Sequence, residues 1–187
     1  MDSFDYAMGL FSVLTALALG DIAISFHRLL RFRHTVRWDI RAIVSAALVT
    51  VTLVRMWFAF WNVRASASLL AFPFYVSIFL ELMLLFLIAA ACLPDDPPND
   101  CDLSQFYESN RIYLWLIFLI FEISYTVHGF WFDGLPRSVL SAAALALPLA
   151  CYAALIGWKA RWLHVGLPLL LIAYQLADRW SDTLSAA

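Results

Sequence analysis

The chain has 187 residues, of which 64% are hydrophobic and only 14% are charged, and its mean hydropathy is +0.81. A soluble globular protein needs more polar surface than this composition provides. The formal net charge is −2, and no DNA-binding motif or basic domain is present, so we expect no nucleic-acid partner. The composition therefore predicts an integral membrane protein in contact with the lipid bilayer.

Apolar segments long enough to cross a membrane recur along the whole chain. A helix needs ~20 apolar residues to span ~30 Å of hydrocarbon. Six segments meet this requirement, at about residues 7–30, 41–62, 69–93, 112–132, 136–157 and 162–179. The acidic N-terminus lacks the basic region of a signal peptide, so the first segment is counted as a span. We therefore expect an all-α protein, a six-transmembrane-helix bundle that forms a single transmembrane domain over residues 1–187.

Basic residues predict the orientation of these spans, because Lys and Arg collect on the cytoplasmic side of a membrane. Lys159 and Arg161 lie between the fifth and sixth segments. Five arginines lie from the end of the first segment to the start of the second, where they could contact anionic lipid headgroups: Arg28, Arg31, Arg33, Arg37 and Arg41. Both termini should therefore be on the outer side. The preference for arginine over lysine is typical of GC-rich bacterial genomes, which suggests a multi-pass protein of a bacterial inner (plasma) membrane.

The loop after the third segment departs from the charge rule, because it is acidic although it faces the arginines. Its acids are Asp95, Asp96, Asp100, Asp102 and Glu108. Two interpretations are open: the acidic and basic loops dock on each other, or both are solvated at the headgroup surface. Exposed ion pairs contribute only ~0.2–1 kcal/mol each, which favours solvated loops. The sequence D-L-S-Q at 102–105 matches a capping box, so the fourth helix should begin before the membrane.

The charged residues Arg55, Glu81 and Glu122 fall well inside the second, third and fourth predicted spans. At ~1.5 Å per residue, both glutamates lie near the midplane and Arg55 lies within reach of either. A charge at a helix centre costs ~2.5–3.5 kcal/mol, so each should face protein rather than lipid. We predict a buried cluster in which Arg55 lies between the two carboxylates, one of which carries a proton.

Helical spacing adds polar neighbours to these charges. In the outer half they should line a polar cavity that opens outward: Thr52, Ser77, Tyr125, Thr126, His128 and Gln175. A second polar group lies toward the cytoplasmic end of the first span: Asp21, Ser25, His27 and Arg28. The histidines and cysteines have no metal-ligand spacing, so we expect no metal, haem or other cofactor and free cysteine thiols.

Three classes of function are compatible with this pattern. A proton-linked transporter or ion channel would use the buried acids directly, and it is slightly preferred. An accessory, sensory or scaffold subunit would need only a structural ion pair that holds helices together. An intramembrane lipid-modifying enzyme would use Glu81 or Glu122 as general base beside His128, but no catalytic motif supports it, so the balance is against an enzyme.

Small residues of the fifth segment predict close helix packing. Ala146, Ala150 and Ala154 recur at four-residue spacing, which lets the backbone of another helix approach. The expected partner is a second copy of the chain or another membrane protein.

Overall fold

The computed structural model describes residues 3–62, 72–96, 100–133 and 138–179. Over these ranges the fold is all-α, with the helices α1 (Ser3–Arg31), α2 (Ile40–Asn62), α3 (Phe72–Cys92), α4 (Leu103–Asp133), α5 (Val139–Gly157) and α6 (Leu163–Arg179). The predicted all-α class is confirmed, and each of the six apolar segments corresponds to one helix. The starts of the third and fifth segments, at residues 69 and 136, lie outside the described residues.

The largest difference from the predicted boundaries is at the start of α4, which begins at Leu103 rather than near residue 112. The side chain of Asp102 caps this helix, because its Oδ1 accepts hydrogen bonds from the backbone N–H groups of Ser104 at 2.9 Å and Gln105 at 3.2 Å. The early start agrees with the D-L-S-Q motif. With 31 residues, α4 is about 46 Å long and extends beyond the hydrocarbon of a bilayer.

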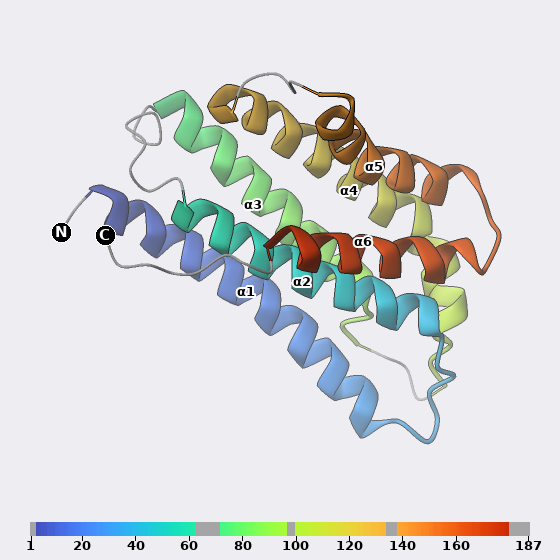
Figure 1. The fold of residues 1–187 in the computed structure, drawn as a ribbon. Helices are drawn as coiled ribbons and strands as arrows, with labels where there is room; N and C mark the ends of the chain where they lie inside the picture. The colour runs from blue at the N-terminus through green and yellow to red at the C-terminus, as the bar shows by residue number, and fades with distance from the viewer. Residues whose placement is uncertain (1–2, 63–71, 97–99, 134–137, 180–187) are drawn as a thin grey trace.

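The helices pack around α2. Contacts connect α1 to α3, α3 to α4, α4 to α5, α5 to α6 and α6 to α2, and α2 also packs against α1, α3 and α4. In the candidate span of α2, 56% of the residues are buried, compared with 22% in α1. Consecutive helices run in opposite directions (Figure 1), so α1, α3 and α5 end where α2, α4 and α6 begin. We call this the arginine-rich end of the bundle.

Within the described part of the chain, four helices are long and apolar enough to cross a membrane, with candidate spans at Met8–Arg31, Ile40–Trp61, Tyr75–Cys92 and Leu103–Phe130. The apolar stretches of α5 and α6, Ser141–Gly157 and Leu163–Asp178, are shorter. Large apolar side chains also cover the outside of the bundle, as Val13, Leu17 and Ile24 of α1 show with exposed fractions of 55–57%. These features indicate a multi-pass membrane protein.

The inner face of α1 shows how the sequence separates core from lipid. Its buried residues recur at alternating spacings of four and three: Phe11, Thr15, Ala18, Ile22, Ser25 and Leu29. This is the stripe by which one helix packs on its neighbours. Both faces of the helix are largely apolar, so the buried stripe is not marked by an apolar side opposite a charged one.

Candidate functional site

An ion pair between α2 and α4 lies in the interior of the bundle. Arg55 Nη2 is 3.6 Å from Glu122 Oε2, and both side chains are 5% exposed. The guanidinium also lies over the ring of Tyr125, with Cζ 4.5 Å from the ring centroid, which is a cation–π contact. The 3.6 Å separation is longer than a hydrogen bond, and Glu122 Oε2 has no hydrogen-bond partner among the described residues.

Glu81 of α3 contacts a different face of α4. Its Oε1 accepts a hydrogen bond from Ser124 Oγ at 2.6 Å and lies 2.7 Å from His128 Nδ1. Ser124 and His128 are four residues apart, so they project from the same side of the helix. The side chain of Glu81 is 2% exposed and that of His128 is 18% exposed. The histidine therefore connects a buried carboxylate with the edge of the bundle.

These four groups give a balanced arrangement of charge. Arg55 and Glu122 carry opposite charges, and Glu81 and His128 can share one proton, either as carboxylate and imidazolium or as carboxylic acid and neutral imidazole. With that proton bound, the cluster is neutral in either form, and without it the cluster carries one negative charge. The prediction from sequence considered only one cation, Arg55, and therefore placed an extra proton on one of the glutamates.

The other residues predicted to line a cavity lie at several places in the core. Thr52 and Gln175 form a buried link between α2 and α6, in which Gln175 Nε2 donates to Thr52 Oγ1 at 3.2 Å. Thr126 is buried on α4, and Ser77 is half-buried on α3. Because the side chains of Arg55, Glu81 and Glu122 are 2–5% exposed, this conformation is closed at the charged cluster rather than open to the outside as predicted.

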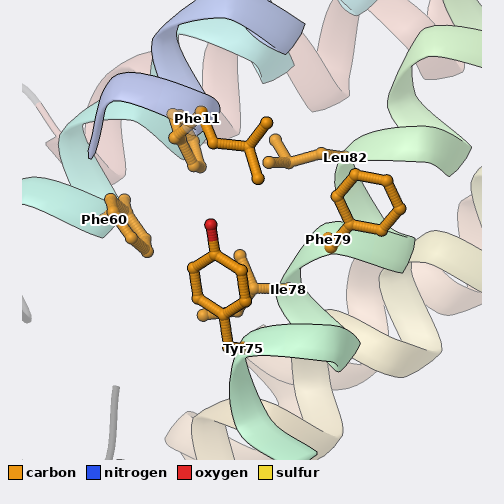
Figure 2. A pocket seen from close by; sticks show the side chains of 7 residues that line it. Phe11, Phe60, Tyr75, Ile78, Phe79 and Leu82 are labelled. Carbon is orange, nitrogen blue, oxygen red and sulfur yellow. The ribbon is translucent and has the colours of Figure 1, made fainter. Parts of the chain in front are cut away.

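A small hollow at the end of the bundle opposite the arginines is apolar. It lies between α1, α2 and α3 and has a volume of about 10 Å³. Figure 2 shows the rings of Phe11, Phe60 and Phe79 around it, with the hydroxyl of Tyr75 directed into it. A space of this size holds at most about one water molecule. It differs in position and lining from the polar cavity predicted among α2, α3 and α4.

The polar residues predicted toward the cytoplasmic end of α1 meet the loop that follows α3. Ser25 Oγ donates to Asp95 Oδ1 at 3.3 Å, and Arg28 Nη1 donates to the backbone carbonyl of Asp95 and to Asp96 Oδ1, the latter at 3.0 Å. Asp21 is half-buried one turn before Ser25, and His27 is exposed. Ser25 and Arg28 therefore tie α1 to this loop.

Arg41 is the centre of a tight cluster at the arginine-rich end. Its Nη2 lies 2.7 Å from Asp39 Oδ2 and 2.9 Å from Ser104 Oγ, its Nη1 contacts Glu108 Oε1, and its Cζ lies 4.9 Å from the ring centroid of Tyr107. The hydrogen bonds from the guanidinium hold the pKa of Asp39 below its usual value. With 2% of its side chain exposed, Arg41 does not face lipid headgroups, and that part of the prediction is wrong.

The acidic and basic loops are docked, contrary to the favoured interpretation of two solvated loops. Backbone hydrogen bonds join them, from Arg37 N to Cys101 O at 2.9 Å and from Leu103 N to Arg37 O at 3.1 Å. The weakness of exposed ion pairs was the wrong criterion, because backbone pairing and the buried Arg41 hold these loops together. Three other arginines remain exposed, as headgroup contact requires: Arg31, Arg33 and Arg37.

Arg111 of α4 was not singled out in the sequence, although it is 4% exposed and highly connected. Its Nη1 donates to three backbone carbonyls where α5 ends: Leu155 at 3.1 Å, Ile156 at 3.2 Å and Trp158 at 2.9 Å. The last carbonyls of a helix have no intrahelical partner and carry partial negative charge. Arg111 therefore fixes the end of α5 against α4.

A chain of hydrogen bonds beside Arg111 links α4 to α6. Trp115 Nε1 donates to Tyr107 Oη at 3.0 Å, Tyr107 Oη lies 2.7 Å from His164 Nδ1, and His164 Nε2 lies 2.9 Å from the carbonyl of Trp158. A carbonyl only accepts, so Nε2 of His164 is the protonated nitrogen. The signal in the sequence was the four-residue spacing of Tyr107, Arg111 and Trp115, which places them on one side of α4.

The fold and these clusters define the class: a multi-pass helical membrane protein with buried ion pairs. Among the residues that the structure describes, no three His, Cys, Asp or Glu side chains form a group that could hold a metal ion. Comparison of the chain with protein-family models, curated proteins and solved structures gives no match.

Proposed function

We propose that this chain is a proton-linked transport protein in which His128 and Glu81 form the protonation site. The observation that supports the proposal is the 2.7 Å contact between a partly exposed imidazole and a buried carboxylate on neighbouring helices. Buried acids and histidines in membrane spans are the usual components of proton relays. A neighbouring ion pair, Arg55 with Glu122, would respond to the charge on Glu81 because the same helix, α4, carries both contacts.

The proposal includes six spans, with both termini on the outer side of a bacterial inner membrane. Helix α5 has 19 residues and α6 has 17, which correspond to about 28 and 26 Å, close to the ~30 Å of hydrocarbon. Both helices run alongside the longer ones in Figure 1 rather than across the end of the bundle. The arginine-rich end is assigned to the cytoplasm by the positive-inside rule.

The geometry suggests how a proton would pass. In this scheme a proton arrives from the outer side at Nε2 of neutral His128, and the imidazolium then gives its Nδ1 proton to Glu81 Oε1. The imidazole is neutral again, and Glu81 is a carboxylic acid. The charge attraction between α3 and α4 is lost in this step, so protonation would favour separation of the two helices near Glu81.

Proton flux into liposomes tests this proposal. The purified chain would be reconstituted around a pH-sensitive dye, with empty liposomes as background and Asp100→Asn, which changes an exposed carboxyl outside the helices, as the matched control. We expect the wild type and Asp100→Asn to carry protons under an imposed gradient, Glu81→Gln to abolish the flux and His128→Gln to reduce it. Wild-type liposomes that leak no more than empty ones, under gradients of protons and common ions, would contradict a transport function.

A structural role in a larger membrane assembly is the second candidate. It is favoured by the full burial of the Arg55–Glu122 pair and by the stacking of Arg55 on Tyr125, which together hold α2 against α4. In this case Glu122→Gln and Glu81→Gln would lower the free energy of unfolding without any change in ion flux. The same purified variants therefore distinguish the two candidates.

A further inference from the structure

A groove between α3 and α4 at the arginine-rich end is separate from the charged cluster. Its volume is about 240 Å³, and its apolar lining includes Leu87, Ala90 and Ala91 of α3. Its lining also includes polar residues, among them Asp95 and Asn110. This is somewhat smaller than the ~300–1,000 Å³ of a small-molecule pocket, so it suits a part of a lipid molecule rather than the whole.

The groove lies near the end of α3 and the start of α4, which would be the interface region of a membrane that these helices cross. Leu87 is about 8 Å before the end of α3, and Tyr113, which also lines the groove, is about 15 Å after the start of α4. The exposed fractions of Leu87 and Tyr113 are 40% and 48%, so the groove is open to the surroundings of the bundle. Its apolar part is directed along α3 toward the hydrocarbon, and Asp95 marks the end nearest to water.

Opposite charges meet beside Asp95, which is one of the residues that line the groove. The exposed carboxylate of Asp95 has one hydrogen bond among the described residues, from Ser25 at 3.3 Å, and a carboxylate can accept several. Arg28, whose side chain is 43% exposed, is held beside it by hydrogen bonds from Nη1 to the Asp95 carbonyl and to Asp96. A carboxylate and a guanidinium thus lie next to each other beside the groove, with Asp95 in its lining and Arg28 adjacent to Asp95.

We propose that this groove binds a phospholipid with a primary-amine headgroup, of the phosphatidylethanolamine type. The ammonium donates to Asp95, the phosphate accepts from Arg28, and the first part of an acyl chain lies along Leu87, Ala90 and Ala91. A choline headgroup has no N–H to donate to Asp95, and a glycerol headgroup has no cation to balance Asp95 and Asp96. The inference concerns a lipid site and does not depend on proton transport.

Lipid retention measured by native mass spectrometry tests the proposal. The full chain would be extracted from bilayers with equal amounts of dioleoyl phosphatidylethanolamine, phosphatidylcholine and phosphatidylglycerol. We expect one bound phosphatidylethanolamine, preferred about tenfold over phosphatidylcholine. A preference of this size corresponds to one charge-assisted hydrogen bond, from the ammonium to Asp95. Asp95→Asn should remove the preference, and Asp100→Asn, also exposed and acidic, should retain it.

A second variant separates the groove from its headgroup contacts. Ala90→Leu fills the apolar part and should reduce retention of all three lipids, with helix content checked by circular dichroism. Equal retention of phosphatidylethanolamine and phosphatidylcholine by the wild type, or an unchanged preference in Asp95→Asn, would overturn the proposal. So would a preference for phosphatidylglycerol, which would assign the site to anionic lipid and Arg28 alone.

Discussion

The two buried arginines of α2 have matching neighbours on α4 but different bonding. Arg41 and Arg55 are separated by about four helical turns, roughly 21 Å. Each stacks on a tyrosine of α4, Arg41 on Tyr107 and Arg55 on Tyr125, with distances of 4.9 and 4.5 Å to the ring centroids. Each also lies near a glutamate of α4, Glu108 or Glu122.

The difference is in how closely the carboxylates approach. Arg41 has a bidentate contact with Asp39, with Nε–Oδ1 at 3.1 Å and Nη2–Oδ2 at 2.7 Å. The Arg55–Glu122 separation of 3.6 Å is longer than a hydrogen bond, and a histidine-bound acid lies on the other face of α4. The first arrangement fixes the ends of helices. Under the proposed function, the second arrangement would respond to the charge on Glu81.

The largest effect is expected from Arg41→Met. It leaves Asp39 and Glu108 without their shared cation, and Asp39 is only 9% exposed. Removal of one partner of a buried pair costs about 3–5 kcal/mol in the free energy of unfolding. Chemical unfolding in detergent would measure this loss, with Arg33→Met, at an exposed arginine, as the control. Equal stability of the two variants would show that the cluster is not a structural lock.

Glu122→Gln should lower the free energy of unfolding by about 3 kcal/mol, because Arg55 keeps its charge in a buried site. The double variant Arg55→Met/Glu122→Met should recover most of this loss, since apolar replacements of an ion pair are often neutral. A double-mutant cycle of unfolding free energies measures the coupling. If the double variant is less stable than either single one, the pair is more strongly bound than its 3.6 Å separation indicates.

Acid should destabilise the arginine-rich end through Asp39. The pKa of Asp39 is lower in the folded protein than the ~3.9 of an unfolded chain. Its contribution is therefore fully present above pH ~3.9 and is lost as the pH falls through the folded-state value. Unfolding free energies measured between pH 7 and pH 3 should decrease more steeply for the wild type than for Asp39→Asn. The effect is smaller than that of Arg41→Met because Arg41 keeps Glu108.

Tyr107→Phe should lower the free energy of unfolding by about 1–3 kcal/mol. The variant removes the hydroxyl that joins Trp115 to His164, and it leaves buried polar groups unpaired. Thermal unfolding in detergent, followed by circular dichroism, would measure the change. Addition of His164→Phe to this variant should cause little further loss if the two residues act as one unit. Fully additive losses would contradict that coupling.

Tyr125→Phe is expected to have the smallest effect, about 0.5 kcal/mol, because the ring that lies over Arg55 is retained. Tyr125→Leu removes the ring and should cost more, in the same unfolding measurement. The unfolding free energies of Tyr125→Phe and Tyr107→Phe are then compared. A larger loss for Tyr107→Phe is expected, because the hydroxyl of Tyr107 joins Trp115 to His164. A larger loss for Tyr125→Phe than for Tyr107→Phe would reverse the distinction between the two clusters.

The helices could be predicted because each requires only local information. Apolar length gave the six segments, and the side chain of Asp102 with the spacing to Gln105 gave the early start of α4. Arg111 was missed because it fell just outside the predicted fourth span, which was taken to begin at residue 112. Counting the apolar residues needed to cross the hydrocarbon does not detect the part of a helix that continues into the headgroup region.

The partners of Glu81 could not be derived from helical periodicity. Spacing showed that Glu122, Tyr125 and Thr126 share one face of α4, and it equally allowed a second face with Ser124 and His128. The face that meets α3 depends on the rotation of both helices in the bundle, which no local pattern fixes. The predicted cluster of Arg55, Glu81 and Glu122 therefore stays a prediction, whereas the contacts Arg55–Glu122 and Glu81–His128 are seen directly.

The link between Thr52 and Gln175 has a consequence for biosynthesis. The two residues are 123 positions apart, and α2, the most enclosed of the candidate spans, is covered on one side by α6. A ribosome adds roughly 5–20 residues per second, so about 6–25 seconds separate the synthesis of the two positions. During that interval Thr52 lacks its partner on α6, and premature termination before α6 would leave this side of α2 facing acyl chains or the insertion machinery.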